Sequence, residues 1–190
     1  MGYQELITAL RKGFAVREGL KTKGRDVERK VKSAMEKAKA LGIRKDEEIE
    51  EIGKKVRDIM SGSNDREKEV RKYGKLNEIK EELLKTKLEN IDRESPDFLH
   101  LAELTGGFLA WQGATKTQLR RIYNGLRKAE KYLYFKPLLA YTVSRHRAFE
   151  PLYVLLEGTF VKEKEEESKL LAEEFLKAVL AYHLFYGGKD

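Results

Sequence analysis

The uneven distribution of apolar residues constrains the fold of this chain more than any other feature. Residues 21–97 hold 21 hydrophobic residues out of 77, whereas residues 98–190 hold 46 out of 93 and 15 of the 18 aromatic residues. The second half can bury a proper core, and the first can bury only narrow apolar stripes. We expect a domain over 98–190, with a compact helical bundle at about 98–188, and a charged helical extension over 1–97.

The spacing of apolar residues in the first half is helical. They recur three and four residues apart over 27–41 and 49–59. This spacing forms a narrow apolar seam, as in coiled-coil-like packing, and it favours a hairpin of two helices. Residues 1–20 are apolar enough to form a separate short helix that docks on another surface. One longer helix is expected over 65–90. No segment alternates apolar and polar residues as a strand would, so the predicted fold class is all-α.

The second half predicts a core helix over 98–111, interrupted at Gly106 and Gly107. Further helices are expected over residues 115–135, 137–146, 149–160 and 165–186. The last of them has apolar residues nearly all round, which is typical of a helix that is central or lies in an interface.

Composition excludes several classes of protein. The chain has no cysteine, so it has neither disulfides nor thiolate metal sites. No run of about 18 apolar residues is present, and no membrane span is expected. The first ten residues lack the basic-then-apolar order of a secretory signal. We therefore expect a cytoplasmic protein that does not contact membranes.

The positive charge is concentrated in residues 111–147. This segment has a single acid, Glu130, against nine basic residues: Lys116, Arg120, Arg121, Arg127, Lys128, Lys131, Lys136, Arg145 and Arg147. Its net charge of +8 exceeds the +7 of the whole chain. A local basic field on a small domain favours binding to a polyanion, most often a nucleic acid.

A capping box of Thr115 and Gln118 predicts the start of the basic helix. Within it, Lys116, Arg120, Arg127 and Lys131 lie roughly opposite the apolar side, with Arg121 and Lys128 on the flanks. Basic rows on surface helices commonly serve only solubility. Here acidic partners four residues away are missing, and five of the nine cations are arginines, whose planar fork suits phosphate.

Aromatic residues lie near these cations, and most are expected in the core because of their helical spacing. Tyr141 is the exception, because it precedes Arg145 by four residues and shares a helix face with it. Exposed aromatic rings stack the bases of single strands.

Residue patterns for catalysis and cofactors are weak. The three histidines are scattered, and the chain has no phosphate-binding loop, dinucleotide fingerprint or nucleophile elbow. We expect no catalytic residue, no metal and no cofactor. His146, between two arginines, is the one candidate for a general base in RNA cleavage.

Two segments of the basic region resemble a known family. Residues 115–123, TKTQLRRIY, are similar to a segment of the small subunit of type III-A (Csm) CRISPR effector complexes, and residues 136–145, KPLLAYTVSR, resemble its second segment. Both occur in the right order and at the right spacing. The N-terminal half has no recognised counterpart.

The resemblance implies a small helical protein without catalytic activity that functions in antiviral defence. The partners it implies are guide RNA, target RNA, the backbone subunits, the large signature subunit and further copies of itself. The RNA-contacting positions carried over are Lys116, Arg120, Arg121, Lys136 and Arg145. Helix geometry adds Arg127 and Lys131, and exposure of an aromatic ring adds Tyr141.

Two alternatives remain open at the level of sequence. One is a helical scaffold or adaptor whose basic face binds an acidic protein, suggested by the seams at 27–41 and 49–59. The other is a small ribonuclease that uses His146.

Overall fold

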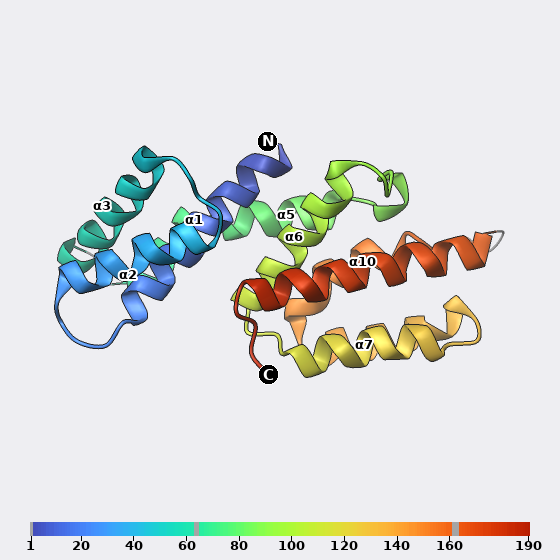
Figure 1. The fold of residues 1–190 in the computed structure, drawn as a ribbon. Coiled ribbons are helices and arrows are strands. Elements are labelled where there is room, and N and C mark those ends of the chain that lie inside the picture. Colours follow the sequence, from blue (N-terminus) through green and yellow to red (C-terminus); the bar gives the residue numbers. More distant parts are fainter. Residues whose placement is uncertain (1, 63–64, 161–163) are drawn as a thin grey trace. The chain divides into compact units, whose positions relative to one another are not determined.

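The computed structural model describes residues 2–62, 65–160 and 164–190, and these form helices joined by short turns (Figure 1). The all-α class is confirmed. The chain divides into two compact units, Met1–Glu78 and Ile79–Asp190, which we call unit 1 and unit 2. The second unit thus begins before the change of composition near residue 97.

Unit 1 is built around its first helix. Helix α1 (Tyr3–Lys21) packs against α2 (Val27–Ala40), α3 (Asp46–Gly62) and α4 (Arg66–Tyr73). The apolar seams of α2 and α3 are buried, and the buried residues of α1 face the same core. The apolar residues of α1 therefore complete the core of unit 1 together with the apolar seams of α2 and α3.

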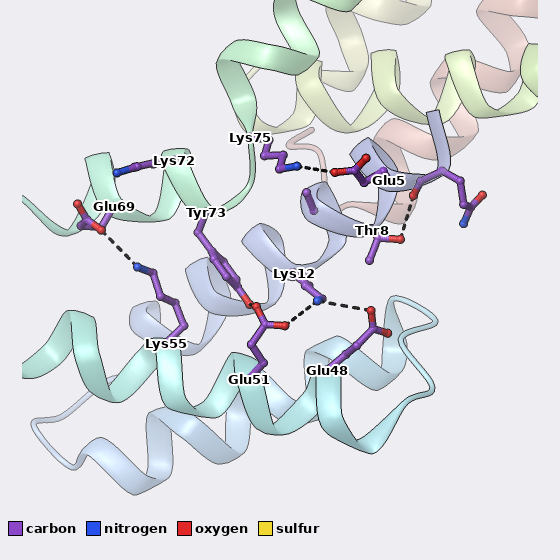
Figure 2. A pocket seen from close by; sticks show the side chains of 12 residues that line it. Glu5, Thr8, Lys12, Glu48, Glu51, Lys55, Glu69, Lys72, Tyr73 and Lys75 are labelled. Carbon is purple, nitrogen blue, oxygen red and sulfur yellow. Dashed lines mark hydrogen bonds and ion pairs between the residues drawn. The ribbon is translucent and has the colours of Figure 1, made fainter. Parts of the chain in front are cut away.

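Charged side chains link three helices of unit 1 across a groove of about 630 Å³ (Figure 2). The Lys12 ammonium lies 2.7 Å from a Glu51 oxygen and 3.4 Å from a Glu48 oxygen, and the Tyr73 hydroxyl donates to Glu51 at 2.8 Å. Burial opposes charge on Lys12, but the two carboxylates keep its pKa above the usual value. Burial and the Glu51 carboxylate together raise the pKa of Tyr73. The groove is lined by basic and acidic side chains whose charges largely cancel.

The single helix expected over 65–90 is wrong. The chain forms α4, then α5 (Leu76–Lys85), then a 3-10 turn η1 (Leu88–Asn90). Gly74 caps the end of α4, and Lys75 follows with a φ of +50°, a left-handed conformation that breaks the helical path. The apolar periodicity continues across this break, which is why the sequence pattern does not reveal it.

The core of unit 2 is the pair α6 (Pro96–Trp111) and α10 (Glu165–Phe185). The interruption expected at Gly106 and Gly107 is wrong, because α6 is continuous through both. A β-carbon on Gly106 would lie 2.6 Å from the Val179 carbonyl oxygen and 2.8 Å from the His183 backbone nitrogen. The glycine therefore allows the backbones of the two helices to approach closely.

The remaining elements of unit 2 surround this pair. They are α7 (Lys116–Lys128), η2 (Tyr132–Phe135), α8 (Lys136–Arg145), η3 (Arg147–Phe149) and α9 (Glu150–Glu157). Helix α7 lies alongside α10 and runs in the opposite direction (Figure 1). None of the described helices combines the length and the apolar character that a membrane span requires.

His183 joins α10 to the turn before α7. Its side chain is fully buried, and its Nε2 atom donates to the Ala114 carbonyl oxygen at 2.8 Å. Within the described part of the chain, its Nδ1 atom has no hydrogen-bond partner. Burial lowers the pKa of His183 because the charged imidazolium would lose its hydration.

We expect Gly106→Ala to reduce the free energy of unfolding of unit 2 by about 1–3 kcal/mol, because the new methyl group meets backbone atoms that cannot rotate away. Gly125→Ala is the matched control, since its methyl group meets only the Leu138 side chain. Chemical denaturation followed by circular dichroism compares the two. Equal losses would contradict the close approach of α6 and α10.

Stability should fall as the pH drops from 7.5 to 5.5. An unfolded histidine takes up a proton near pH 6.5, whereas His183 in the folded protein does so only at lower pH, so protons favour the unfolded state. Denaturant titrations at several pH values measure this slope. In His183→Gln, which keeps a donor for Ala114, the slope should be shallower, and an unchanged slope would show that another group is responsible.

Candidate nucleic-acid interface

Charge is distributed unequally between the two units. Unit 1 has 21 basic against 15 acidic residues, a net charge of +6, and unit 2 has 18 basic against 17 acidic, a net charge of +1. Outside residues 111–147, unit 2 has 9 basic and 16 acidic residues, or −7. The chain outside residues 111–147 is therefore nearly neutral, at −1, because unit 1 contributes +6 and the rest of unit 2 contributes −7. Within unit 2, the basic segment stands out against an acidic background.

The predicted capping box at the start of α7 is confirmed. The Thr115 hydroxyl accepts from the Gln118 backbone N–H at 3.2 Å, and the Gln118 side-chain oxygen accepts from the Thr115 N–H at 2.8 Å. Leu119, Ile122 and Leu126 are buried beneath the helix. Their burial fixes which side of α7 faces solvent.

Four cations occupy the solvent side of α7: Arg120, Arg121, Arg127 and Lys128. Within residues 2–62, 65–160 and 164–190, none of the four forms an ion pair with a carboxylate. The Arg127 guanidinium lies 5.8 Å from the centre of the Tyr123 ring, which holds that side chain against the helix. We call these four residues the basic face of α7.

The predicted extension of this helix to residue 135 is wrong. Helix α7 ends at Lys128, and Ala129 is extended with a ψ of 121°. Buried Tyr132 stacks on Phe160 with ring centres 3.9 Å apart, and its N–H donates to Glu165 at 2.6 Å. These contacts turn the chain away from the helix axis. Lys131, expected on the basic row, is exposed in the turn before η2 instead.

Two of the predicted cations already have partners. The Lys116 ammonium lies 2.5 Å from the Asp190 carboxylate, and the Lys116 N–H donates to the Lys189 carbonyl at 2.7 Å. The hydrogen bond from Lys116, and then its charge, lower the pKa of Asp190. Lys136 lies 3.6 Å from Glu157 and 4.7 Å from the centre of the Phe160 ring. Both ammonium groups are less available to a ligand than those of the basic face.

The pairing expected between Tyr141 and Arg145 is confirmed. The guanidinium donates to the Tyr141 hydroxyl at 2.6 Å and lies 5.6 Å from the ring centre. Both side chains are exposed on α8. A planar cation is thus held beside an aromatic ring at the surface.

Helices α7 and α8 pack side by side, which brings this pair close to the basic face. A β-carbon on Gly125 would lie 2.1 Å from a methyl carbon of Leu138, and the Gln118 side-chain nitrogen lies 2.7 Å from His146 Nε2. The end of α8 therefore lies next to the start of α7. Arg147 follows in η3 and is exposed.

The structure revises the set of candidate residues. It groups Arg120, Arg121, Arg127, Tyr141 and Arg145 on two packed helices, and it leaves Lys131 in a separate turn. Lys128 and Arg147 are exposed and belong with the group, and the excess of basic residues in 111–147 was the sequence signal for both. Gln118 contacts His146 as well as capping α7, and no sequence pattern indicates that second contact.

No group of three or more histidine, aspartate and glutamate side chains among the described residues is arranged to hold a metal ion.

Comparison with known proteins agrees with the two motif segments. Residues 92–189 match the family model described as Csm2 Type III-A. Neither the curated proteins nor the solved structures contain a match to the chain. Because the family model covers more than half of the 190 residues, the chain belongs to the Csm2 family, the small subunits of type III-A CRISPR effector complexes.

Proposed function

We propose that this small subunit holds RNA by its sugar–phosphate backbone through the basic face of α7 and the neighbouring Arg145 and Arg147, without reading sequence and without catalysing a reaction. The observation that carries the proposal is the set of four exposed cations on α7 that lack carboxylate partners among the described residues. We infer that residues 98–190 perform this role and that residues 1–97 are an extension.

The length of the basic face suits a nucleic-acid strand. From Arg120 to Lys128 the helix rises about 12 Å, enough to reach more than one phosphate of a strand. Three of the six exposed cations on α7, α8 and η3 have no acidic residue within three positions on either side: Arg120, Arg121 and Arg145. Arginine forks bind phosphate oxygens in pairs, which favours backbone contacts over base contacts.

The Tyr141–Arg145 pair adds a second kind of contact. Because the tyrosine hydroxyl holds the guanidinium at 2.6 Å, the cation needs little ordering when a strand binds. The exposed Tyr141 ring offers a face on which a base can stack. This contact tolerates any base, which agrees with binding that does not depend on sequence.

We place this subunit beside guide and target RNA, together with the backbone subunits, the large signature subunit and further copies of itself. Exposed apolar residues on α10 support packing against protein neighbours. Leu170, Leu184 and Phe185 are 54%, 42% and 44% exposed on a helix whose other apolar residues are mostly covered. Leu170 and Leu184 are fourteen residues apart, so they lie on nearly the same side of the helix.

We assign His146 no role in RNA cleavage. Its Nε2 atom is engaged by the Gln118 amide at 2.7 Å, and no carboxylate among the described residues pairs with the ring. A general base needs its accepting nitrogen free for the substrate proton. An adaptor for an acidic protein is the competing reading of the basic face, and RNA-binding measurements separate the two.

Arg120→Glu should weaken the binding of single-stranded RNA regardless of its sequence. Loss of one phosphate contact should also reduce the slope of log affinity against log salt by about 0.7–1. Fluorescence anisotropy with labelled RNAs of two different sequences, at several salt concentrations, gives both quantities. Lys85→Glu on α5 is the control, because it changes the net charge equally and lies outside the basic face. Equal effects of the two variants would contradict a local site, and no effect of either would favour the adaptor.

Lys128→Ala should weaken RNA binding more than Lys136→Ala. The Lys128 ammonium has no carboxylate partner among the described residues, whereas Lys136 must first leave Glu157 and the Phe160 ring. Exposed ion pairs contribute about 0–1 kcal/mol, so the difference should be a few-fold in affinity. The same anisotropy titration compares them, and a larger effect of Lys136→Ala would show that the strand follows α8 rather than α7.

A further inference from the structure

A groove of about 600 Å³ lies at the first turn of the helix that carries the basic face, where the end of α6, the start of α7 and η3 meet. Its lining combines apolar, amide, imidazole and cationic groups. The residues that matter here are Phe108, Gln112, Gln118, His146, Arg147 and Phe149. Phe108 and Phe149 are buried and form an apolar base, whereas His146 and Arg147 are exposed at its rim. Mixed linings of this kind suit small planar ligands with polar edges.

The hydrogen bonds around Gln118 determine which nitrogen of His146 carries a proton. The Gln118 oxygen already accepts from the Thr115 N–H at 2.8 Å, so its amide nitrogen is the atom that faces His146. That nitrogen can only donate, and His146 Nε2 must accept. The neutral ring therefore carries its proton on Nδ1. His146 presents a donor and an exposed ring, both held in place by the capping box.

At the start of α7, few backbone N–H groups are available to bind a phosphate in the groove. The N–H groups of Thr115, Lys116 and Gln118 are already bonded to the Gln118 side chain, the Lys189 carbonyl and the Thr115 hydroxyl. Lys80, at the opposite edge, lies 2.9 Å from Glu150. Arg147 is the cation at the rim with no carboxylate partner among the described residues. An anion is thus favoured at the rim and a neutral ligand inside.

Gln112 supplies a polar group inside the groove. It is the C-cap residue of α6, and its backbone N–H donates to the Phe108 carbonyl oxygen. Across the described ranges, its side-chain amide has no hydrogen-bond partner. An amide offers both a donor and an acceptor, as the edge of a nucleobase requires.

We propose that this groove receives one unstacked nucleoside of the RNA strand that the basic face holds. The base lies against the His146 ring and bonds to the Gln112 amide, and its phosphate stays at the rim with Arg147. Continuity supports this ligand over others, because His146 lies between Arg145 and Arg147 in sequence and contacts the first turn of α7 through Gln118. The inference rests on the proposed RNA binding and adds a contact that requires a base.

The test compares two ligands on the full-length protein. One is a labelled single-stranded RNA, and the other is an abasic oligomer of the same length, which keeps the phosphates but has no bases. His146→Ala and Gln112→Ala should each weaken RNA binding about fivefold or more and change abasic binding less than about twofold. Asn77→Ala, an exposed amide on α5 outside both the groove and the basic face, is the matched control and should change neither.

Arg120→Glu, measured in parallel, separates this inference from the proposed function. It should weaken binding of both ligands. If it does so while Gln112→Ala and His146→Ala affect both ligands equally or neither, the nucleoside site is overturned and the backbone clamp stands. If Arg120→Glu changes neither ligand, the proposed function fails first. Because His146→Ala also removes the contact with Gln118, circular dichroism must show unchanged helix content, and Gln112→Ala gives an independent result.

Discussion

The close approach of α6 to the backbone of α10 is the constraint on which unit 2 depends. Gly106 has no side chain to separate the two helices, so α10 occupies the centre of the unit. The segments at its two ends then hold the basic helix. Near its start, Lys169 donates to the Ala129 carbonyl at 2.8 Å, and beyond its end the Lys189 carbonyl accepts from the Lys116 N–H. The orientation of α7 is therefore a property of the core.

This arrangement explains how a small unit with a net charge of only +1 can offer a strongly basic surface. The cations are gathered on one side of α7 and at the end of α8, while the acids that balance them lie in other elements. Among the described residues none of the four cations forms an ion pair with a carboxylate, and the field of the basic face is offset only in part, by the charge interaction of Arg120 with Asp190. Family membership, an exposed cationic row and a preorganised Tyr141–Arg145 pair agree with a protein that holds a strand by its backbone. The salt dependence of such binding is an intrinsic consequence of counterion release.

Much of the candidate site could be predicted from residues close together in the sequence. The capping box, the solvent side of α7 and the Tyr141–Arg145 pair all arise from contacts within four residues, where helix geometry leaves little freedom. The end of α7 could not be predicted, because Tyr132 is drawn out of the helical path by Phe160 and Glu165, which lie about thirty residues later. The partners of Lys116 and Lys136 also lie far along the chain, at Asp190 and Glu157, so the sequence pattern did not show that these two ammonium groups are paired.

The sequence by itself determined the all-α class, the basic segment and the family, because these depend on composition, periodicity and short motifs. Only the tertiary structure decided where the helices end and which of the predicted cations pair with a carboxylate. It showed that α6 continues through Gly106 and Gly107 and that Gly106 joins it closely to α10, although glycine more often interrupts helices. It also showed that Lys75 breaks an apolar pattern that continues on both sides. The physical reason is common to these cases: local preferences differ by about 1 kcal/mol or less per residue, and long-range packing and ion pairing outweigh them.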